Sequence, residues 1–212
     1  MKLKLFAAVS AASIAIATVA STSVGAYTLL GYKWAQPVVP YYINPANMDL
    51  PTAAIEPAIR TGADAWRSQS GASFAFAFAG YSTQATNTND GINLIMFRNA
   101  SSGSALATTY TWFSGTRMID ADMVFWDAGF QFFTGSTGCS GGFYVEDVAT
   151  HEFGHALGLG HSTVATATMY PSISTCSQQS RTLDADDIAA VLSLYPSSAT
   201  PPIAPTRLRI IR

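Results

Sequence analysis

The stretch HEFGHALGLGHS, residues 151–162, contains all three histidines of this 212-residue chain. Residues four apart on an α-helix share one face, so a helix here places the rings of His151 and His155 side by side. Glu152 then lies at the edge of the same face. Glycine tolerates the left-handed conformation of a sharp turn, so Gly158 is expected to end the helix and turn the chain back.

That turn brings His161 toward the first two rings, which gives three imidazole ligands for one metal ion. Three protein ligands plus one water molecule are typical of a catalytic zinc, because the fourth position stays open for chemistry. Two histidines on one helix face, with a glutamate after the first, form a zinc motif in which the glutamate is the general base. We therefore predict that His151, His155 and His161 bind one Zn²⁺. Glu152 is the predicted catalytic residue.

Two other interpretations of the histidine cluster remain open at this point. The histidines could be solvated residues on an ordinary helix, or they could bind a purely structural zinc. A chain with so few histidines gives no reason for all of them to gather within twelve residues. A structural zinc takes four protein ligands, and no fourth ligand is evident near the motif, where a carboxylate instead follows the first histidine.

The composition favours one globular domain with a sizeable core. The chain is 49% hydrophobic and 11% charged, with a formal net charge of −2. A chain of this length buries enough apolar surface to stabilise a single domain. The near-neutral charge, without any basic stripe, argues against nucleic acid as a partner.

The first 26 residues differ in kind from the rest of the chain. Two lysines precede an apolar run over residues 5–20, and small residues follow. This pattern predicts a secretory signal peptide over residues 1–26, with cleavage after Ala20 or Ala26. A membrane anchor is the alternative, but the run is short and is interrupted by serine and threonine. We expect a secreted protein, extracellular or in a periplasm, with no membrane contact after cleavage.

The chain has two cysteines, Cys139 and Cys176. An even pair in an exported protein predicts a disulfide, because an oxidising compartment favours the bond. The bridge would close a loop of about 38 residues and contribute roughly 4 kcal/mol in the chain-entropy model. Two free thiols and a metal-binding pair are the alternatives, and the signal peptide argues against both.

Hydrophobic periodicity predicts an α+β domain with a mostly antiparallel or mixed sheet. Near-helical spacing places Pro57 either in the first turn of the first helix or at a kink. The tail over residues 197–212 has no apolar period, is rich in proline and is expected to be disordered. The expected strands cover residues 38–44, 73–80, 91–98, 105–113 and 117–126, and the expected helices cover residues 52–69, 144–157 and 184–194.

The residues HEFGHALGLGH (151–161) resemble the extended zinc signature of the metzincin clan of metalloproteases. A serine directly after the third histidine, here Ser162, resembles the pattern of the matrixin branch of that clan. The stretch ATMYP (167–171) resembles the Met-turn of the same branch, which would place Met169 beneath the zinc as an apolar floor. Tyr170 follows the methionine directly, as in matrixins, and is therefore not assigned as a ligand.

Two further segments, one near each end of the expected domain, also resemble matrixins. YTLLGYKW (27–34) is similar to the matrixin N-terminal segment, and LDADDIAAVLSLYP (183–196) is similar to the C-terminal helix. The resemblance implies a metzincin-like zinc protease domain over residues 27–196. Its expected architecture is a twisted mixed sheet of about five strands with an early helix, an active-site helix and a C-terminal helix.

The chain also departs from the matrixin pattern. A matrixin zymogen carries a propeptide cysteine that caps the zinc, whereas both cysteines here lie far downstream, so this latency switch is expected to be absent. The structural zinc of the family needs further histidines, and the chain has no histidine besides the three in the motif. Asp120 and Asp122 occupy the place of calcium-linked acids, but few other acids surround them and the loop NASSGS (99–104) is short. Ca²⁺ is therefore a possible second ion, and solvated strand ends are the alternative for these two acids.

The family implies a protein or peptide substrate that lies extended along an edge strand and adds to the sheet. Ala105–Ala107 resembles the part of that strand nearest the zinc, and Pro171–Ile173 resembles the wall of the pocket just past the scissile bond. We predict a secreted, zinc-dependent endopeptidase that is monomeric. The alternatives are a catalytically silent protein of the same fold that binds zinc and peptides, and an enzyme that hydrolyses a non-peptide amide.

Overall fold

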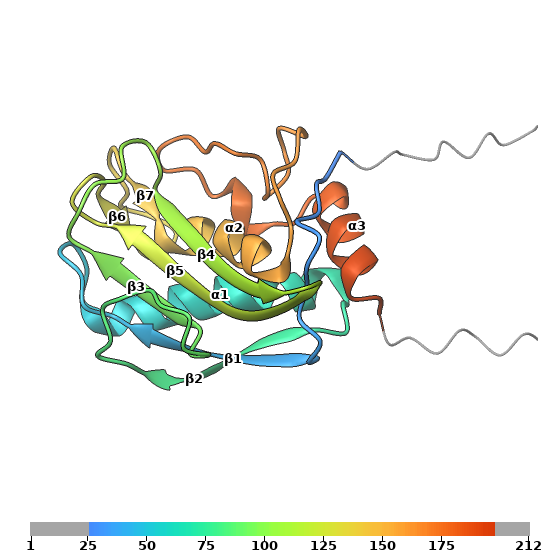
Figure 1. The fold of residues 1–212 in the computed structure, drawn as a ribbon. Coiled ribbons are helices and arrows are strands. Elements are labelled where there is room, and N and C mark those ends of the chain that lie inside the picture. Colours follow the sequence, from blue (N-terminus) through green and yellow to red (C-terminus); the bar gives the residue numbers. More distant parts are fainter. Residues whose placement is uncertain (1–25, 198–212) are drawn as a thin grey trace, which may run out of the picture.

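The computed structural model describes residues 26–197 (Figure 1). The predicted signal peptide and the predicted disordered tail lie outside the described residues, apart from Ala26 and Ser197. In chain order the elements are β1 (Val38–Asn44), α1 (Thr52–Ser70), β2 (Ala75–Tyr81), β3 (Leu94–Arg98), β4 (Ala107–Ser114), β5 (Arg117–Trp126), β6 (Phe132–Phe133), β7 (Phe143–Tyr144), α2 (Val145–Leu157), the 3₁₀ helix η1 (Gln179–Arg181) and α3 (Ala185–Leu194).

All the strands and helices that periodicity predicts are present, with their ends shifted by about three residues at most. The sequence did not reveal β6, β7 and η1, because elements of two or three residues contain no full period. Pro57 lies inside α1, in its second turn, so of the two alternatives for this residue the place in the first turn is wrong.

The five longer strands form one mixed sheet in the order β2-β1-β3-β5-β4. β1 pairs in parallel with β2 and β3, and β3 pairs in parallel with β5. β4 is an edge strand and runs antiparallel to β5. A mixed sheet is therefore confirmed, whereas a mostly antiparallel sheet is wrong. Side chains alternate in the same way along strands of either direction, so direction depends on crossover connections that periodicity does not reveal.

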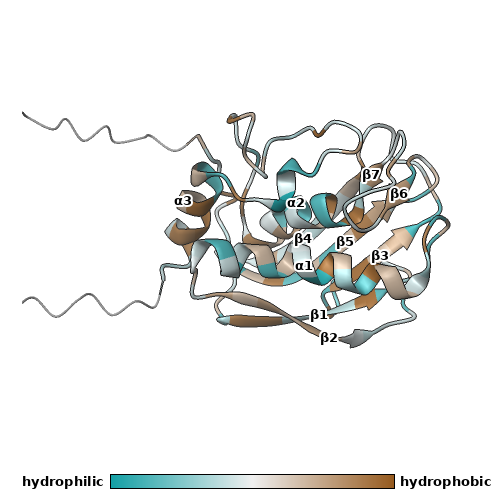
Figure 2. Ribbon diagram, turned by 180° about the vertical axis from the view of Figure 1, so that it is seen from behind, coloured by the Kyte–Doolittle hydropathy of each residue, from teal (hydrophilic) through white to brown (hydrophobic). Residues whose placement is uncertain are grey.

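Helices α1 and α2 cover one face of the sheet, and α3 packs against α1 (Figure 1). The main core lies between this face and the helices and includes Ile43 from β1, Ile59 from α1 and Phe153 from α2. A smaller apolar cluster around Met96 and Trp126 occupies the opposite face. In Figure 2 the central strand β3 is coloured mostly as hydrophobic, and four of its five residues are buried, as expected for a strand that is covered on both faces.

Asp120 and Asp122 lie inside β5 and are fully buried, so their interpretation as solvated strand ends is wrong. Both carboxylates accept hydrogen bonds from backbone N–H groups in and near the loop between β2 and β3. Asp120 accepts from two loop residues at 2.8 and 2.9 Å, and Asp122 accepts from Thr88 and Leu94 at 2.8 and 2.9 Å. Burial raises the pKa of Asp122 to about 7, while these N–H donors oppose the shift. The two acids therefore anchor this loop to β5.

The predicted disulfide joins Cys139 and Cys176, whose Cα atoms are 5.5 Å apart. The bond links the loop before β7 to the segment that leads into η1. Neither cysteine is free, so the two alternatives of free thiols and a metal-binding pair are excluded.

We predict that a digest of the unreduced protein contains one peptide pair joined through Cys139 and Cys176, which mass spectrometry detects and which reduction separates. Because the bond closes a loop of about 38 residues, replacing both cysteines by serine should lower the free energy of unfolding by roughly 4 kcal/mol. Urea denaturation of the two proteins measures this difference. Two thiols that react with iodoacetamide in the folded, unreduced protein would contradict the disulfide.

Arg181 in η1 holds α2 to the loop before β7. Its Nε donates to Asp147 at 2.6 Å, its Nη1 pairs with Glu146 at 3.2 Å, and its Nη2 donates to the carbonyl oxygen of Gly135 at 2.9 Å. Asp147 is fully buried, and burial raises its pKa while the Arg181 cation opposes the shift. The guanidinium also lies 4.7 Å from the centre of the Tyr144 ring. One cation thus joins three segments of the chain.

Replacing Arg181 by methionine leaves the buried carboxylate of Asp147 without its cation. Loss of one partner from a buried ion pair is strongly destabilising, so Arg181→Met should lower the free energy of unfolding by about 3 kcal/mol. The matched control is Arg60→Met, which breaks an exposed pair with Glu56 and should have a much smaller effect. Urea denaturation compares the variants, and equal small losses would rule out a structural role for the buried pair.

Candidate active site and metal centre

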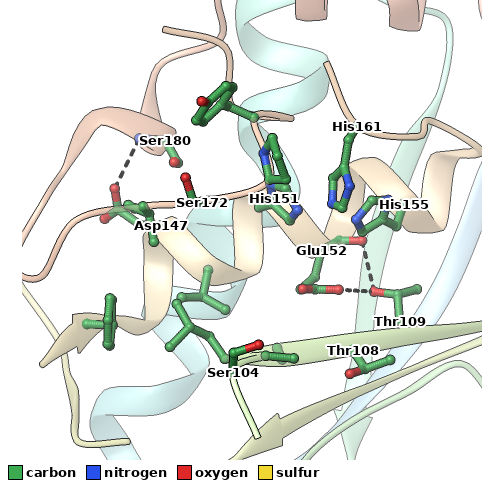
Figure 3. A pocket seen from close by; sticks show the side chains of 18 of the residues that line it. Ser104, Thr108, Thr109, Asp147, His151, Glu152, His155, His161, Ser172 and Ser180 are labelled. Atoms are coloured by element: carbon green, nitrogen blue, oxygen red, sulfur yellow. Dashed lines mark hydrogen bonds between the residues drawn. The ribbon is translucent and has the colours of Figure 1, made fainter. Parts of the chain in front are cut away.

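Helix α2 carries the first part of the histidine motif and ends where the sequence predicts. Gly158 adopts a left-handed conformation with φ of 103°, and its N–H donates to the carbonyl oxygens of Gly154 and His155. A β-carbon on Gly158 would lie 2.2 Å from the carbonyl oxygen of Tyr32, so only glycine fits. The turn brings His161 back beside the helix (Figure 3).

The three predicted ligands His151, His155 and His161 converge, and one ring nitrogen of each lies within 4.8 Å of those of the other two. Nδ1 of His151 is 2.7 Å from the carbonyl oxygen of Thr168, and Nδ1 of His155 is 2.9 Å from that of Leu159. A carbonyl oxygen only accepts, so each of these Nδ1 atoms carries the proton. The lone pair on each Nε2 is therefore free for a metal ion.

Burial favours the neutral form of two of the three imidazoles. It lowers the pKa of His155, with Glu152 opposing the shift and His151 reinforcing it. Burial also lowers the pKa of His161, and the neighbouring His155 acts in the same direction. A neutral imidazole is the form that binds a metal ion, so this donor set fits zinc.

Glu152, the predicted base, lies beside His151 and is 6% exposed. Its Oε2 accepts a hydrogen bond of 2.6 Å from Oγ1 of Thr109 on β4, drawn as a dashed line in Figure 3. The sequence did not reveal this contact. The two residues are 43 positions apart, and no local pattern links them.

Met169 packs against α2 and is 1% exposed. A β-carbon on Gly154 would lie 2.2 Å from the Met169 sulfur, so the approach of the Met-turn to the helix requires glycine between the two histidines. Asp187 in α3 accepts hydrogen bonds from the N–H groups of Thr168 at 2.7 Å and of Met169 at 3.0 Å. Sequence reasoning missed Gly154 and Asp187, although a glycine inside a helix and an acid in a first turn are detectable signals.

A second acid in α3, Asp186, fixes the chain directly after His161. Its Oδ2 accepts a hydrogen bond from Oγ of Ser162 at 2.6 Å, and its Oδ1 accepts from the N–H of Ala26 at 2.6 Å. The N–H of Ser162 donates in turn to the carbonyl oxygen of Met169 at 2.9 Å. The serine after the third histidine thus joins the loop that carries His161 to the Met-turn and, through Asp186, to α3 and Ala26.

A cleft of about 490 Å³ contains the histidines and Glu152. Ala105–Ala107 lines one side of it and Pro171–Ile173 lines another, so the structure brings the predicted edge strand and the predicted pocket wall to the same site. The rest of the lining includes the apolar side chains of Phe130, Phe143 and Val148 and the polar residues Asp147 and Ser180.

Both cysteines of the chain are in the disulfide, so neither thiol is free to cap the metal centre. Within residues 26–197, the three clustered histidines are the one group of three histidine, cysteine or acidic side chains whose ligand atoms lie close enough for one metal ion. A second zinc site built from such side chains is therefore not found in that part of the chain.

The domain is a metalloprotease domain of the metzincin type, because its Met-turn packs beneath a helix that presents two histidines and a glutamate to a cleft along an edge strand. A family model for matrixins matches residues 33–196. The chain belongs to the matrixin family, which is a family of zinc metalloendopeptidases.

Individual relatives agree with this assignment. The chain is 32% identical to karilysin from Tannerella forsythia over 178 residues, which are 80% of this chain and 34% of karilysin. It is 27% identical to matrix metalloproteinase-20 from Homo sapiens over 169 residues, 77% of this chain and 32% of the relative. Over 48 residues, 23% of this chain and 18% of the relative, it is 50% identical to matrilysin from Rattus norvegicus. The chain thus matches only about a third of the length of the first two relatives.

Proposed function

We propose that this protein is a zinc-dependent endopeptidase that cleaves extended polypeptides. The observation that supports this function most directly is the convergence of three imidazole nitrogens within 4.8 Å of one another in an open cleft, with Glu152 beside them. His151, His155 and His161 would hold one zinc ion. The carbonyl oxygens bonded to two of the rings support this role, because they leave Nε2 free on each.

Zinc held by three histidines lowers the pKa of a water molecule to about 7 and polarises a substrate carbonyl group. Glu152 accepts the proton that the water loses as its oxygen attacks the carbonyl carbon. The same carboxyl group then donates that proton to the amide nitrogen while the C–N bond breaks. The products are one new carboxyl end and one new amino end, and Glu152 returns to its initial state.

The edge strand β4 supports an extended polypeptide as the substrate. Within residues 26–197 its outer side has no neighbour in the sheet, so its backbone N–H and C=O groups can pair with a substrate strand. Backbone pairing does not read side chains. Selectivity is therefore assigned to the pocket beside Pro171–Ile173, where Val148 and Phe143 provide apolar surface and Asp147 lies at the polar part of the lining.

The wild-type protein loaded with zinc should cleave casein or gelatin, and a chelator should abolish cleavage. Glu152→Ala should keep zinc, because the three histidines are intact, and should lose at least about a hundredfold in kcat. Metal analysis and casein kinetics measure the two effects. The matched control Glu56→Ala changes an acid on α1, outside the cleft, and should cleave at the wild-type rate.

Each alternative function has its own outcome in this experiment. Cleavage by Glu152→Ala at the wild-type rate would show that the mechanism is wrong. A wild-type protein that binds zinc and peptides without cleaving them would be the catalytically silent protein. Hydrolysis restricted to non-peptide amides would show that the protein is an enzyme for such amides and not a peptidase.

The signal peptide, secretion, the domain limits 27–196 and the monomeric state remain proposals. No helix within the described residues is long and apolar enough to cross a membrane. The N–H of Ala26 donates to Asp186, and this contact would persist after cleavage behind Ala20 but would be lost after cleavage behind Ala26.

Calcium binding at Asp120 and Asp122 is a possibility that the sequence left open, and the contacts of both acids argue against it. Calcium takes six to eight oxygen ligands. Both oxygens of Asp122 and one of Asp120 already accept backbone N–H groups, and Oδ1 of Asp120 is buried without a partner among the described residues. We expect millimolar calcium to leave the Tm unchanged in calorimetry. A rise of several degrees that Asp120→Asn removes would instead establish a calcium site.

A further inference from the structure

We propose that Thr109 is a positioning residue that holds the carboxylate of Glu152 in its catalytic orientation; this inference rests on the role of Glu152 proposed above. Oγ1 of Thr109 lies 2.6 Å from Oε2 of Glu152 and 3.1 Å from the backbone carbonyl oxygen of the same residue. Figure 3 shows both contacts, which reach from β4 to the helix that carries the histidines.

The hydroxyl of Thr109 has one proton, and both neighbouring oxygens are acceptors. The contact with the carboxylate is the shorter of the two, and a hydrogen bond to a charged acceptor is roughly twice as strong as a neutral one. The proton is therefore donated mainly to Oε2 of Glu152. No other described side chain donates to this carboxylate, so Oε1 is the oxygen left for proton transfer.

The alternation of side chains along β4 explains why the hydroxyl points at α2. Ala107 belongs to the main core, which lies between the sheet and the helices, so positions 107 and 109 share the face toward α2. Thr108 turns to the opposite face, where its hydroxyl accepts a hydrogen bond of 2.9 Å from Nε1 of Trp126. A register shift of one residue against β5 would turn the Thr109 hydroxyl away from Glu152.

β4 thus has two roles at once. Its outer edge is available to the substrate backbone, and the side chain of Thr109 holds the base. Because both interactions belong to one strand, the position of a bound peptide and the orientation of the carboxylate are fixed relative to each other. Catalysis by a positioned base requires such fixed spacing.

The competing explanation is that Thr109 only packs β4 against α2. Valine has nearly the same shape as threonine but no hydroxyl, so Thr109→Val keeps the packing and removes the donor. Serine keeps the hydroxyl and loses a methyl group, so Thr109→Ser keeps the donor and reduces the packing. The two variants therefore separate positioning from packing.

Thr109→Val should lower kcat by roughly tenfold to a hundredfold, because a small displacement of a catalytic group has an effect of that size. Its KM should stay within about twofold, since the peptide binds to the backbone of β4. Thr109→Ser should cleave at nearly the wild-type kcat. The control Thr61→Val removes the hydroxyl of an exposed residue of α1 and should leave both constants unchanged.

Crystal structures of the zinc-loaded variants give a readout that does not depend on activity. The Glu152 carboxylate should adopt a new orientation, or several, in Thr109→Val and keep its wild-type orientation in Thr109→Ser. Chelator competition should give equal zinc dissociation constants for the wild type and both variants, because none of the ligands is changed.

A Thr109→Val protein with kcat within about twofold of the wild type would overturn the proposal. A Thr109→Ser protein as slow as Thr109→Val would indicate packing, and a valine variant that fails to fold by circular dichroism would indicate that the hydroxyl serves the fold; each result would overturn the proposal too. All of these results leave the proposed function intact if Glu152→Ala is inert. Wild-type cleavage by Glu152→Ala would instead overturn the role of the base itself, and the positioning role with it.

Discussion

The Nδ1 atoms of His151 and His155 are held by two backbone carbonyl oxygens, and the geometry of the whole site depends on these contacts. One carbonyl belongs to Thr168 in the Met-turn, and the other belongs to Leu159, which follows the C-cap Gly158 of α2. A ring that is hydrogen-bonded at Nδ1 does not rotate freely, so its Nε2 keeps one direction before any metal ion arrives. The path of the Met-turn therefore determines how a histidine on the helix is presented.

Buried carboxylates fix irregular segments of the domain, including those next to the histidine cluster. Asp187 holds the Met-turn, Asp186 holds Ser162 next to the third histidine, and Asp120 and Asp122 hold the loop between β2 and β3. Each accepts hydrogen bonds from groups in irregular segments, whose donors would otherwise lack partners in the fold. In a chain with only 11% charged residues, these acids serve as anchors for loops.

The two walls of the cleft are held in different ways. β4 is paired with β5 along its whole length, so that wall is part of the sheet. Pro171–Ile173 belongs to an irregular segment between the Met-turn and η1, which is fixed at Cys176 by the disulfide and at Arg181 by its contacts with α2. The first wall offers backbone groups and the second offers side chains, so we assign substrate selectivity to the second.

The sequence by itself determined helix α2, its end at Gly158, the sheet strands and the histidine cluster, because helical and strand periods and glycine turns are local properties of the backbone. Only the tertiary structure decided the parallel strand directions, the burial of Asp120, the close approach of Met169 to Gly154 and the contact of Thr109 with Glu152. Each of these joins segments that are distant along the chain, and no local period encodes which distant segment lies opposite.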